Sequence, residues 1–312
     1  MLLALRPAAI FTTGGYVSLP VLIAAAPLRI PVVMWDGNVV PGRSVRVTAG
    51  LADCIAVAFE ETSRTLGKRK PCFVTGTPIR DPGSMSRAAA RNALGIPAGD
   101  GLLLIFGGSQ AVRRFNAAVA AALPRLLARV RVIHVTGDAG YAEAAAGLAA
   151  LPEPLRPRYR PERFLTDDMT AALAAADLVV GRAGSSTLAE VAAFGLPMVV
   201  VPYPHAAGHQ RRNAEEMVRA GAARLVEDAD FDAEALLSAA AIIGDAGEHA
   251  RMAAAARALA RPGAAGAVAE LVLATARRQP LPDAARVEAI SRGVEGGGPA
   301  HGTAGASGSA GK

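Results

Sequence analysis

The chain has 312 residues, of which 52% are hydrophobic and 19% charged, so it carries enough apolar surface for a sizeable core in about two domains. Aromatic residues make up only 4% and small apolar residues dominate, which favours α/β layers over an all-β sandwich. The net charge of +6 comes from arginines scattered along the chain rather than from one basic run, so we expect no nucleic-acid interface.

Membrane-spanning and metal-binding patterns are not found in the sequence. No apolar stretch reaches the roughly 20 residues that a spanning helix needs. The apolar N-terminus MLLALRPAAIF is interrupted by Arg6 and Pro7, and we do not interpret it as a signal peptide. Cys54 and Cys72 are far apart and have no histidine partners at metal-ligand spacing, so we expect two reduced core thiols and no metal.

Residues 1–81 alternate short apolar runs with helical stretches. The expected strands are AAIFTT, PVVMWD, CIAVAF and CFVTG, each ending in polar or glycine residues. The expected helices between them are VSLPVLIAAAPL and SVRVTAGLA. Strands that alternate with helices imply parallel pairing with right-handed crossovers, so this segment predicts an α/β domain.

Residues 82–100 form the expected linker, with prolines and glycines around one short helix. Residues 101–279 are typical of a complete doubly wound domain. Its expected strands are Leu102–Phe106, Val130–Thr136, Leu178–Gly181, Met198–Pro202 and Ala223–Val226. Helices DDMTAALAAA and SSTLAEVAAFG lie between them, and Ala264–Arg278 is the last well-patterned helix. Gly, Ala, Ser and Pro dominate residues 280–312, which are predicted to be disordered.

A glycine turn follows the first strand of the second domain. The strand LLLIF runs directly into GGSQ, Gly107–Gln110, and then into a predicted helix. Unpaired backbone N–H groups and the helix dipole at such a helix start favour an anion. Gly107 and Gly108 let a phosphate approach the backbone, and Ser109 adds a hydroxyl donor. Taken alone, this turn is equally well interpreted as a tight connection.

The second turn spans Gly181–Glu190, with the sequence GRAGSSTLAE. A strand ends at Val180, and Ser185 or Ser186 can cap the helix that follows. Glu190 lies one helical turn further, where a carboxylate can accept two hydrogen bonds from a ribose diol. The alternative is a capping box with a solvated glutamate.

The third loop lies within Pro202–Met217, follows another strand, and holds His205, His209, Gln210 and Asn213. All three loops come after parallel strands of one predicted sheet, so they share the edge at which such folds bind ligands. Their co-occurrence is much more specific than any single loop, and it predicts one ligand site.

Several runs of the sequence together resemble the MurG family. They are TGGYVSLP, NVVPG, VTGTPIR, GGSQ, the stretch DDMTAALAAADLVVGRAGSSTLAEVAAFGLPMVVVPYP, and HQRRNA. The resemblance runs from about Phe11 to Arg278, and the order and spacing of the motifs carry it. It implies the GT-B architecture, in which two Rossmann-like domains face each other across a cleft. The second domain would hold the sugar nucleotide and the first the acceptor.

The resemblance also implies roles for individual residues. It assigns donor binding to Asn38, Arg80, Ser109, Glu190 and Gln210. Further contacts with the donor phosphates or sugar would come from Gly107, Gly108, Ser185 and His209. The family inverts the sugar and needs no cofactor or tightly held metal, and we interpret the DxD triplet Asp228–Asp230 as a solvated loop.

The chain departs from the family pattern in several places. WDGN stands at Trp35–Asn38 where the family has HEQN. Ala111 stands where the family usually has glycine, and His209 stands where glutamine is common. The family begins with a strand and a glycine-rich loop close to GGTGGH, whose histidine is a candidate general base. The chain starts after that point, so we expect a truncated N-terminal domain and assign no catalytic residue.

By this resemblance we expect an inverting transferase that moves N-acetylglucosamine from UDP-GlcNAc to undecaprenyl-pyrophosphoryl-MurNAc-pentapeptide, the step from lipid I to lipid II in peptidoglycan synthesis. The lipid acceptor implies a peripheral position on the cytoplasmic face of the cell membrane. One alternative is a donor-binding subunit or inactive homologue whose cleft needs a separate chain with the missing N-terminal half. Another is a GT-B enzyme, such as an epimerase, that shares the nucleotide domain and acts on a different acceptor.

Overall fold

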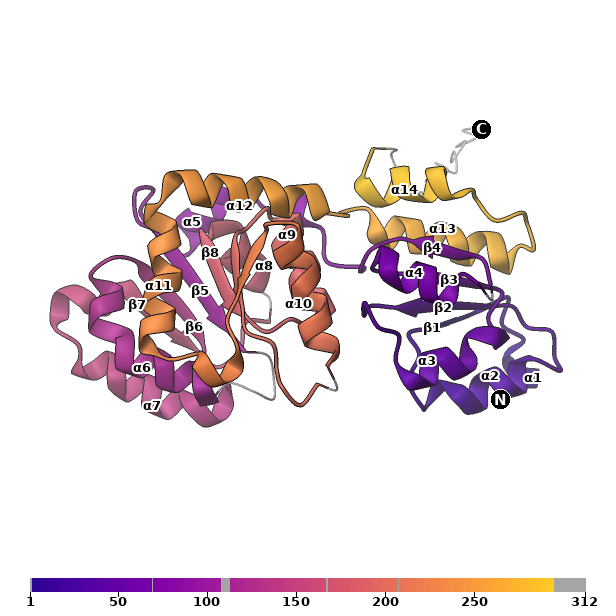
Figure 1. Ribbon diagram of the computed structural model, residues 1–312, viewed down its shortest axis with the longest axis horizontal. Coiled ribbons are helices and arrows are strands. Elements are labelled where there is room, and N and C mark those ends of the chain that lie inside the picture. Colours follow the sequence, from indigo (N-terminus) through magenta and orange to yellow (C-terminus); the bar gives the residue numbers. More distant parts are fainter. Residues whose placement is uncertain (1, 69, 108–112, 167, 207, 295–312) are drawn as a thin grey trace, which may run out of the picture.

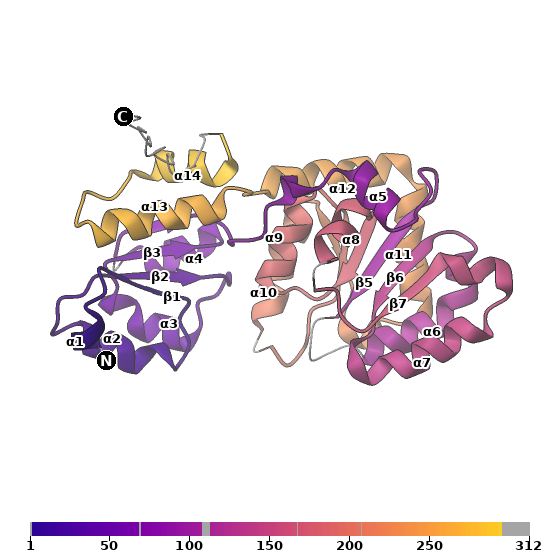
Figure 2. The same cartoon turned by 180° about the vertical axis from the view of Figure 1, so that it is seen from behind.

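The structure is a computed structural model that describes residues 2–68, 70–107, 113–166, 168–206 and 208–294. Two α/β domains lie side by side, each built around a parallel sheet (Figure 1). The view from behind shows helices on both faces of each sheet (Figure 2). The two-domain α/β fold expected from the sequence is confirmed.

The first domain has four parallel strands in the order β1-β2-β3-β4. These strands are β1 Ile10–Thr12, β2 Val32–Asp36, β3 Cys54–Val57 and β4 Cys72–Val74. Its first helices are α1 Leu2–Leu5, α2 Ser18–Ala25, α3 Arg43–Thr48 and α4 Glu60–Leu66, with a 3-10 turn at Ala49–Leu51. Each strand lies within one of the expected apolar runs, and the parallel pairing is confirmed.

The first sheet is buried on both faces, which explains why its strands are continuously apolar. Met34 and Ile55 belong to a core that includes Leu22 of α2. Their strand neighbours Val33 and Cys54 point to the opposite face, where they join a second core. Parallel sheets need cover on both sides, and residues from the C-terminal part of the chain supply the second cover.

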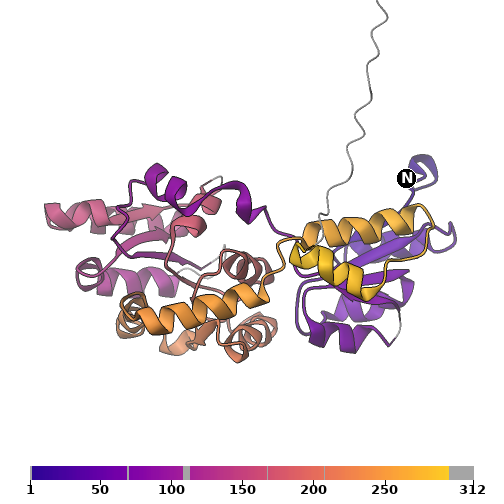
Figure 3. The ribbon, with the colours of Figure 1, turned by 90° about the horizontal axis from the view of Figure 1, so that it is seen from above.

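The last two helices return to the first domain. They are α13 Ala264–Ala276 and α14 Ala284–Arg292, and they lie over its sheet (Figure 3). The second domain therefore ends before α13, earlier than the sequence predicts. The expectation of disorder after residue 279 is wrong for α14, because Val287 and Ile290 are buried and the Asp283 side chain caps the helix. Residues 295–312 lie outside the described residues.

The second domain has six parallel strands in the order β10-β9-β8-β5-β6-β7. They are β5 Leu102–Phe106, β6 Arg131–Val135, β7 Tyr159–Glu162, β8 Leu178–Gly181, β9 Met198–Val200 and β10 Ala223–Leu225. The sequence predicts all but β7, whose residues YRPE contain no apolar run. Pro161 is tolerated there because β7 is an edge strand.

Eight helices described by the structure surround this sheet. They are α5 Arg87–Ala93, α6 Arg113–Leu127, α7 Gly137–Ala150, α8 Met169–Ala175, α9 Ser185–Ala193, α10 His209–Arg219, α11 Ala233–Gly244 and α12 Ala246–Leu259. Short 3-10 turns lie at Pro82–Ser84, Glu153–Arg158 and Asp228–Asp230. Leu104 and Val179 pack into a core with residues of α8, α9 and α10. Leu103 and Val180 point to the other face, toward α6 and α11.

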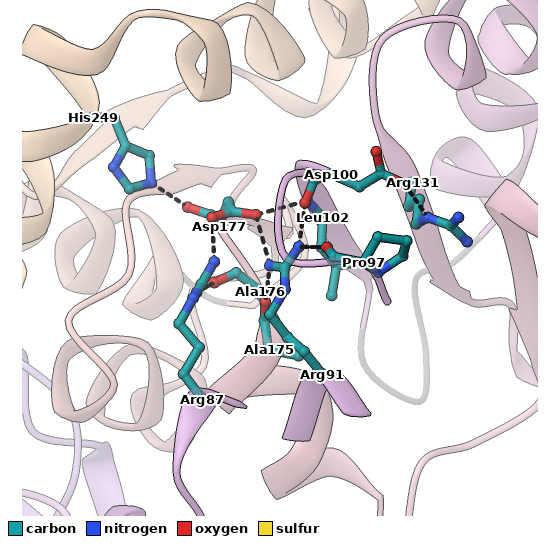
Figure 4. A network of polar contacts seen from close by, with 10 residues as sticks. All are labelled: Arg87, Arg91, Pro97, Asp100, Leu102, Arg131, Ala175, Ala176, Asp177 and His249. Carbon is teal, nitrogen blue, oxygen red and sulfur yellow. Dashed lines mark hydrogen bonds and ion pairs between the residues drawn. The ribbon is translucent and has the colours of Figure 1, made fainter. Parts of the chain in front are cut away.

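A network of buried polar contacts fastens α5 to the second sheet (Figure 4). The Asp177 carboxylate accepts hydrogen bonds from the backbone N–H of Leu102 at 2.7 Å and from Arg87 at 2.5 Å. Arg91 reaches the same carboxylate at 3.4 Å and also donates to the carbonyl of Asp100. The short helix expected inside a linker is therefore an integral part of the second domain.

We expect Arg91→Ala to destabilise the second domain by about 1–3 kcal/mol, because the carbonyl of Asp100 loses its donor, while the Asp177 carboxylate keeps its contacts with Arg87 and the Leu102 N–H. The Arg91 side chain is 7% exposed and that of Asp177 is 17% exposed. Arg125→Ala is the matched control, since the Arg125 and Glu234 side chains are 62% and 70% exposed. That variant should lose much less stability, because water screens an exposed ion pair. Urea unfolding of both variants measures the difference, and equal losses would contradict the role given to the network.

Candidate functional site

Three loops of the second domain begin side by side because their strands are in register. Phe106 of β5 pairs with Gly181 of β8, and Gly181 pairs with Val200 of β9. The strand order reverses direction between β5 and β8, and such a switch point is where doubly wound sheets bind ligands. Gly107 follows β5 directly and is buried. The predicted phosphate contacts Gly108 and Ser109 lie outside the described residues.

Arg182 ties these loops together from inside the domain. Its guanidinium donates to the carbonyls of Val201 at 3.1 Å and Pro202 at 3.3 Å. It also pairs with the Asp228 carboxylate at 2.6 Å and lies over the Phe115 ring, 4.7 Å from its centre. The first aspartate of the DxD triplet is therefore occupied by an ion pair. Within the described part of the chain, no cluster of His, Cys, Asp or Glu could hold a metal ion.

Glu190 lies on α9 and is partly buried. Burial raises the pKa of its carboxyl group above the usual range, and the positive charge of Arg80 opposes this shift. Arg80 itself donates to the carbonyl of Thr166 at 2.8 Å, which fixes it against the second domain. The structure thus brings two of the predicted donor-binding residues, Arg80 and Glu190, into one electrostatic environment.

The start of α9 differs from the sequence-based prediction. Its N-cap is Gly184, so neither Ser185 nor Ser186 caps the helix. Glu190 is the sixth residue of the helix rather than the third, which rules out the capping-box interpretation. The Glu190 carboxylate is therefore not used as a capping group of this helix.

His209 and Gln210 are the first two residues of α10, and their side chains contact different parts of the structure. The Gln210 Oε1 accepts hydrogen bonds from the backbone N–H of Ala183 at 3.2 Å and of Tyr203 at 2.9 Å. It therefore joins the loop after β8 to the loop after β9. His209 Nδ1 lies 3.1 Å from the carbonyl of Val40 in the first domain. Direct contact of either side chain with a donor stays a prediction.

Asn38 faces the second domain from the end of β2. Its backbone N–H and its side-chain Nδ2 both donate to the Asp36 carboxylate, at 3.0 Å and 3.4 Å. Its Oδ1 accepts from Asn213 of α10 at 3.3 Å. Burial raises the pKa of Asp36, whose side chain is almost fully enclosed and acts here as a hydrogen-bond acceptor for the loop. Asn38 thus contacts the second domain, and its contact with a donor stays a prediction.

Gly37 lies next to Asn38, close to the second domain. A Cβ atom on Gly37 would lie 2.7 Å from Ser185 Oγ across the cleft. It would also overlap a ring carbon of Trp35, whose Nε1 donates to the carbonyl of Gly76 at 3.0 Å. The departures from the family pattern at residues 35 and 37 therefore fit each other, because the tryptophan ring fills space that a side chain on residue 37 would need.

A hollow of about 670 Å³ opens on the first-domain side of the cleft. It is lined by Tyr16, the loop after Val40, Arg43 and Arg46, and His209 of the second domain. Two arginines at its rim give this side of the cleft a positive potential. The arrangement suits an acceptor that carries negative charge.

The sequence alone gives no role to Arg182, Asp36, Thr62 or Asn213. The hydroxyl of Thr62 donates to the carbonyls of Asn38 at 2.7 Å and Val39 at 3.0 Å. These residues contact the loops rather than the open cleft, so no ligand-binding pattern marks them. A signal for Arg182 did exist, because an arginine directly after a buried strand must find buried partners.

Two α/β domains, each built on a parallel sheet, face each other across a cleft, and the second has nucleotide-type loops. This arrangement defines a GT-B glycosyltransferase. The family models for the glycosyltransferase family 28 N-terminal and C-terminal domains match residues 1–57 and 102–269. The chain belongs to glycosyltransferase family 28, within which its relatives are of the MurG type.

Two curated relatives carry the name UDP-N-acetylglucosamine–N-acetylmuramyl-(pentapeptide) pyrophosphoryl-undecaprenol N-acetylglucosamine transferase. The chain is 38% identical to the one from Roseiflexus sp., covering 86% of this chain and 69% of the relative. It is 39% identical to the one from Cutibacterium acnes, covering 84% and 72%. The crystal structure of Acinetobacter baumannii MurG matches with a TM-score of 0.69 and 27% identity, over 87% of this chain and 75% of that one. A Listeria monocytogenes structure described as a UDP-N-acetylglucosamine 2-epimerase, at 16% identity, shares the fold.

We expect Gly37→Ala to destabilise the protein by about 1–3 kcal/mol, the usual cost of forcing an extra methyl group into a packed site. The new Cβ would overlap the Trp35 ring and crowd Ser185 Oγ. Gly50→Ala is the control, because a Cβ on exposed Gly50 meets no atom within 4 Å. Urea unfolding compares the two variants. Ser185→Ala in the Gly37→Ala background should restore part of the loss, and no restoration would argue against close contact between the domains.

Proposed function

We propose that this chain transfers N-acetylglucosamine from UDP-GlcNAc to undecaprenyl-pyrophosphoryl-MurNAc-pentapeptide, with inversion at the sugar. The observation that carries the proposal is that β5, β8 and β9 end at one edge of the sheet, with Glu190 on the helix after β8, and that Asn38 of the first domain contacts α10 of the second. The names of relatives at 38–39% identity support the same reaction.

The second domain supplies what a departing UDP needs. The start of α9 lies directly after β8, where backbone N–H groups and the helix dipole favour negative charge. In an inverting displacement a hydroxyl of the acceptor forms a bond to the anomeric carbon, loses its proton, and UDP leaves with the electrons of the broken bond. Donors that are already in place stabilise the growing charge on the pyrophosphate without reorganisation. We assign no general base.

The first domain would present the acceptor. Its cleft side has a hollow rimmed by Arg43 and Arg46, which suits the pyrophosphate named in the relatives' acceptor. An acceptor on a polyprenol chain requires access to a lipid surface, so we propose a peripheral position on the cytoplasmic face of the membrane. None of the helices in the described residues is both long and apolar enough to cross a bilayer.

The decisive experiment for the proposed function is transfer from radiolabelled UDP-GlcNAc to the lipid-linked acceptor by the full-length gene product. Formation of the disaccharide product supports the proposal. UDP-GlcNAc binding without any transfer would instead support a donor-binding protein. Failure to bind UDP-GlcNAc in calorimetry would overturn both.

We expect Glu190→Ala to lower the affinity for UDP by at least about tenfold, since a hydrogen bond to a charged group contributes about 1.5–3 kcal/mol. The carboxylate is proposed to accept from the ribose diol. Glu234→Ala, which removes an exposed carboxylate from the same domain, should leave the affinity unchanged. Isothermal calorimetry with UDP measures both variants, and equal affinities would contradict the proposed ribose contact.

The same contact predicts a pH dependence. Burial raises the pKa of Glu190, and the ribose diol binds the ionised carboxylate, so UDP affinity should fall as the pH drops through this raised pKa. The fall should begin at a higher pH than an ordinary glutamate would give. The Glu190→Gln variant cannot titrate at this position and serves as the reference. Dividing the wild-type affinity by the affinity of this variant at each pH also removes the titration of UDP itself. Arg80→Ala should move the midpoint to higher pH, and a pH-independent ratio of wild type to Glu190→Gln would refute the assignment.

A further inference from the structure

Asn213 lies on the first turns of α10 and is 1% exposed. Its Oδ1 accepts a hydrogen bond from the backbone N–H of Val39 at 3.0 Å. Its Nδ2 donates to Asn38 Oδ1 at 3.3 Å and to the carbonyl of Ala183 at 3.3 Å. One buried amide thus contacts the cleft loop of the first domain and the loop after β8 of the second.

The loop on the first-domain side is held from its own domain as well. Thr62 donates to the carbonyls of Asn38 and Val39, and Asp36 accepts from Asn38. The Asn38 side chain therefore has its amide nitrogen directed to Asp36 and its oxygen directed to Asn213. Apart from Asn213, none of the described residues of α10 donates a hydrogen bond to that oxygen.

The loop on the second-domain side has other supports. Gln210 accepts from the backbone N–H of Ala183, and Arg182 is fixed by the Asp228 carboxylate and two carbonyls. Loss of the bond from Asn213 to the Ala183 carbonyl therefore leaves this loop fastened. The consequence of losing Asn213 should fall mainly on Asn38.

We propose that Asn213 is a positioning residue that orients Asn38 across the cleft, so that affinity for a whole sugar nucleotide depends on it while affinity for the nucleoside diphosphate alone does not. Asn38 belongs to the first domain, whereas the loops proposed to hold the uridine diphosphate belong to the second, so we take the sugar as the group that Asn38 contacts. This inference rests on the proposed function, because it takes UDP-GlcNAc as the ligand.

Two substitutions separate the contacts of this amide. Asn213→Ala removes all three hydrogen bonds. Asn213→Asp keeps an acceptor for Val39 but places a second oxygen against Asn38 Oδ1 and the Ala183 carbonyl, where a donor is needed. Both variants should bind UDP-GlcNAc about tenfold more weakly than the wild type and bind UDP within about twofold of it, since one lost hydrogen bond to the sugar corresponds to about 1 kcal/mol or more. Isothermal calorimetry measures both ligands.

A double-mutant cycle with Asn38→Ala tests whether Asn213 acts through Asn38. In the Asn38→Ala background, Asn213→Ala should cause no further loss of UDP-GlcNAc affinity, because residues in one hydrogen-bond network are not additive. Thr275→Val is the control, because it removes a buried polar group that lies outside the cleft. The Thr275 hydroxyl contacts Cys54 Sγ at 3.7 Å. That variant should bind both ligands as the wild type does. Additive losses, or an equal loss of UDP affinity, would overturn the positioning role.

Hydrogen exchange at the Val39 amide gives a test that needs no ligand. This N–H is buried and bonded to Asn213 in the wild type. It should exchange faster in Asn213→Ala and stay protected in Asn213→Asp. Unchanged protection in Asn213→Ala would overturn the inference even if UDP-GlcNAc did not bind. If the wild type binds UDP-GlcNAc and the Asn213 variants bind it equally well, the inference fails while the proposed function stands.

Discussion

The parallel pairing of β5 with β8 is the constraint on which the site depends. Strands that run in the same direction must end at the same edge, so the loops after Phe106 and Gly181 start as neighbours. Because the strand order turns around between these two strands, the connections that follow them leave in opposite directions. The position of Glu190, one and a half turns into the helix after β8, follows from this pairing and from the tight entry at Gly184.

The path of the chain links the two domains more closely than their separate sheets suggest. After α12 the chain returns, and α13 and α14 cover the face of the first sheet that contains Val33 and Cys54. The returning segment also contacts the segment that leaves the first domain after β4. A Cβ on Gly76, which has a φ of +82°, would lie 2.8 Å from the Arg261 side chain. Arg261 in turn pairs with Glu288 of α14 at 2.7 Å. The first domain therefore cannot be assembled from the N-terminal part of the chain alone.

The sequence predicts the strands well because they are short apolar runs with clear ends, and it predicts the shared edge because parallel strands leave no other choice. It fails for β7, where Tyr159 and Pro161 face inward without an apolar run around them. It also fails for α14, since a composition rich in glycine and alanine hides the spacing of Val287 and Ile290. Local patterns cannot show which sheet a helix will cover, because that depends on contacts between residues distant in sequence.

Among the site residues, sequence reasoning finds side chains that resemble known ligand contacts and misses those that hold the loops. Glu190 and Asn38 were marked by the sequence pattern, whereas Arg182 and Asn213 were given individual roles only once their partners were visible. Asn213 shows why: its three partners are backbone or amide groups on two segments distant in sequence, and no spacing rule relates them to it.

The hydrogen bonds described between the domains at the cleft join polar groups, in contrast to the apolar cores on either side. Val39 and Asn38 meet Asn213 through hydrogen bonds, and His209 meets the carbonyl of Val40. Behind them lies a cavity of about 250 Å³ that includes Leu188. A polar interface that encloses open space costs little to separate and re-form, so relative motion of the two domains is expected. The hydrogen bonds of a buried amide form in one register only, so Asn213 specifies one position for Asn38 relative to α10.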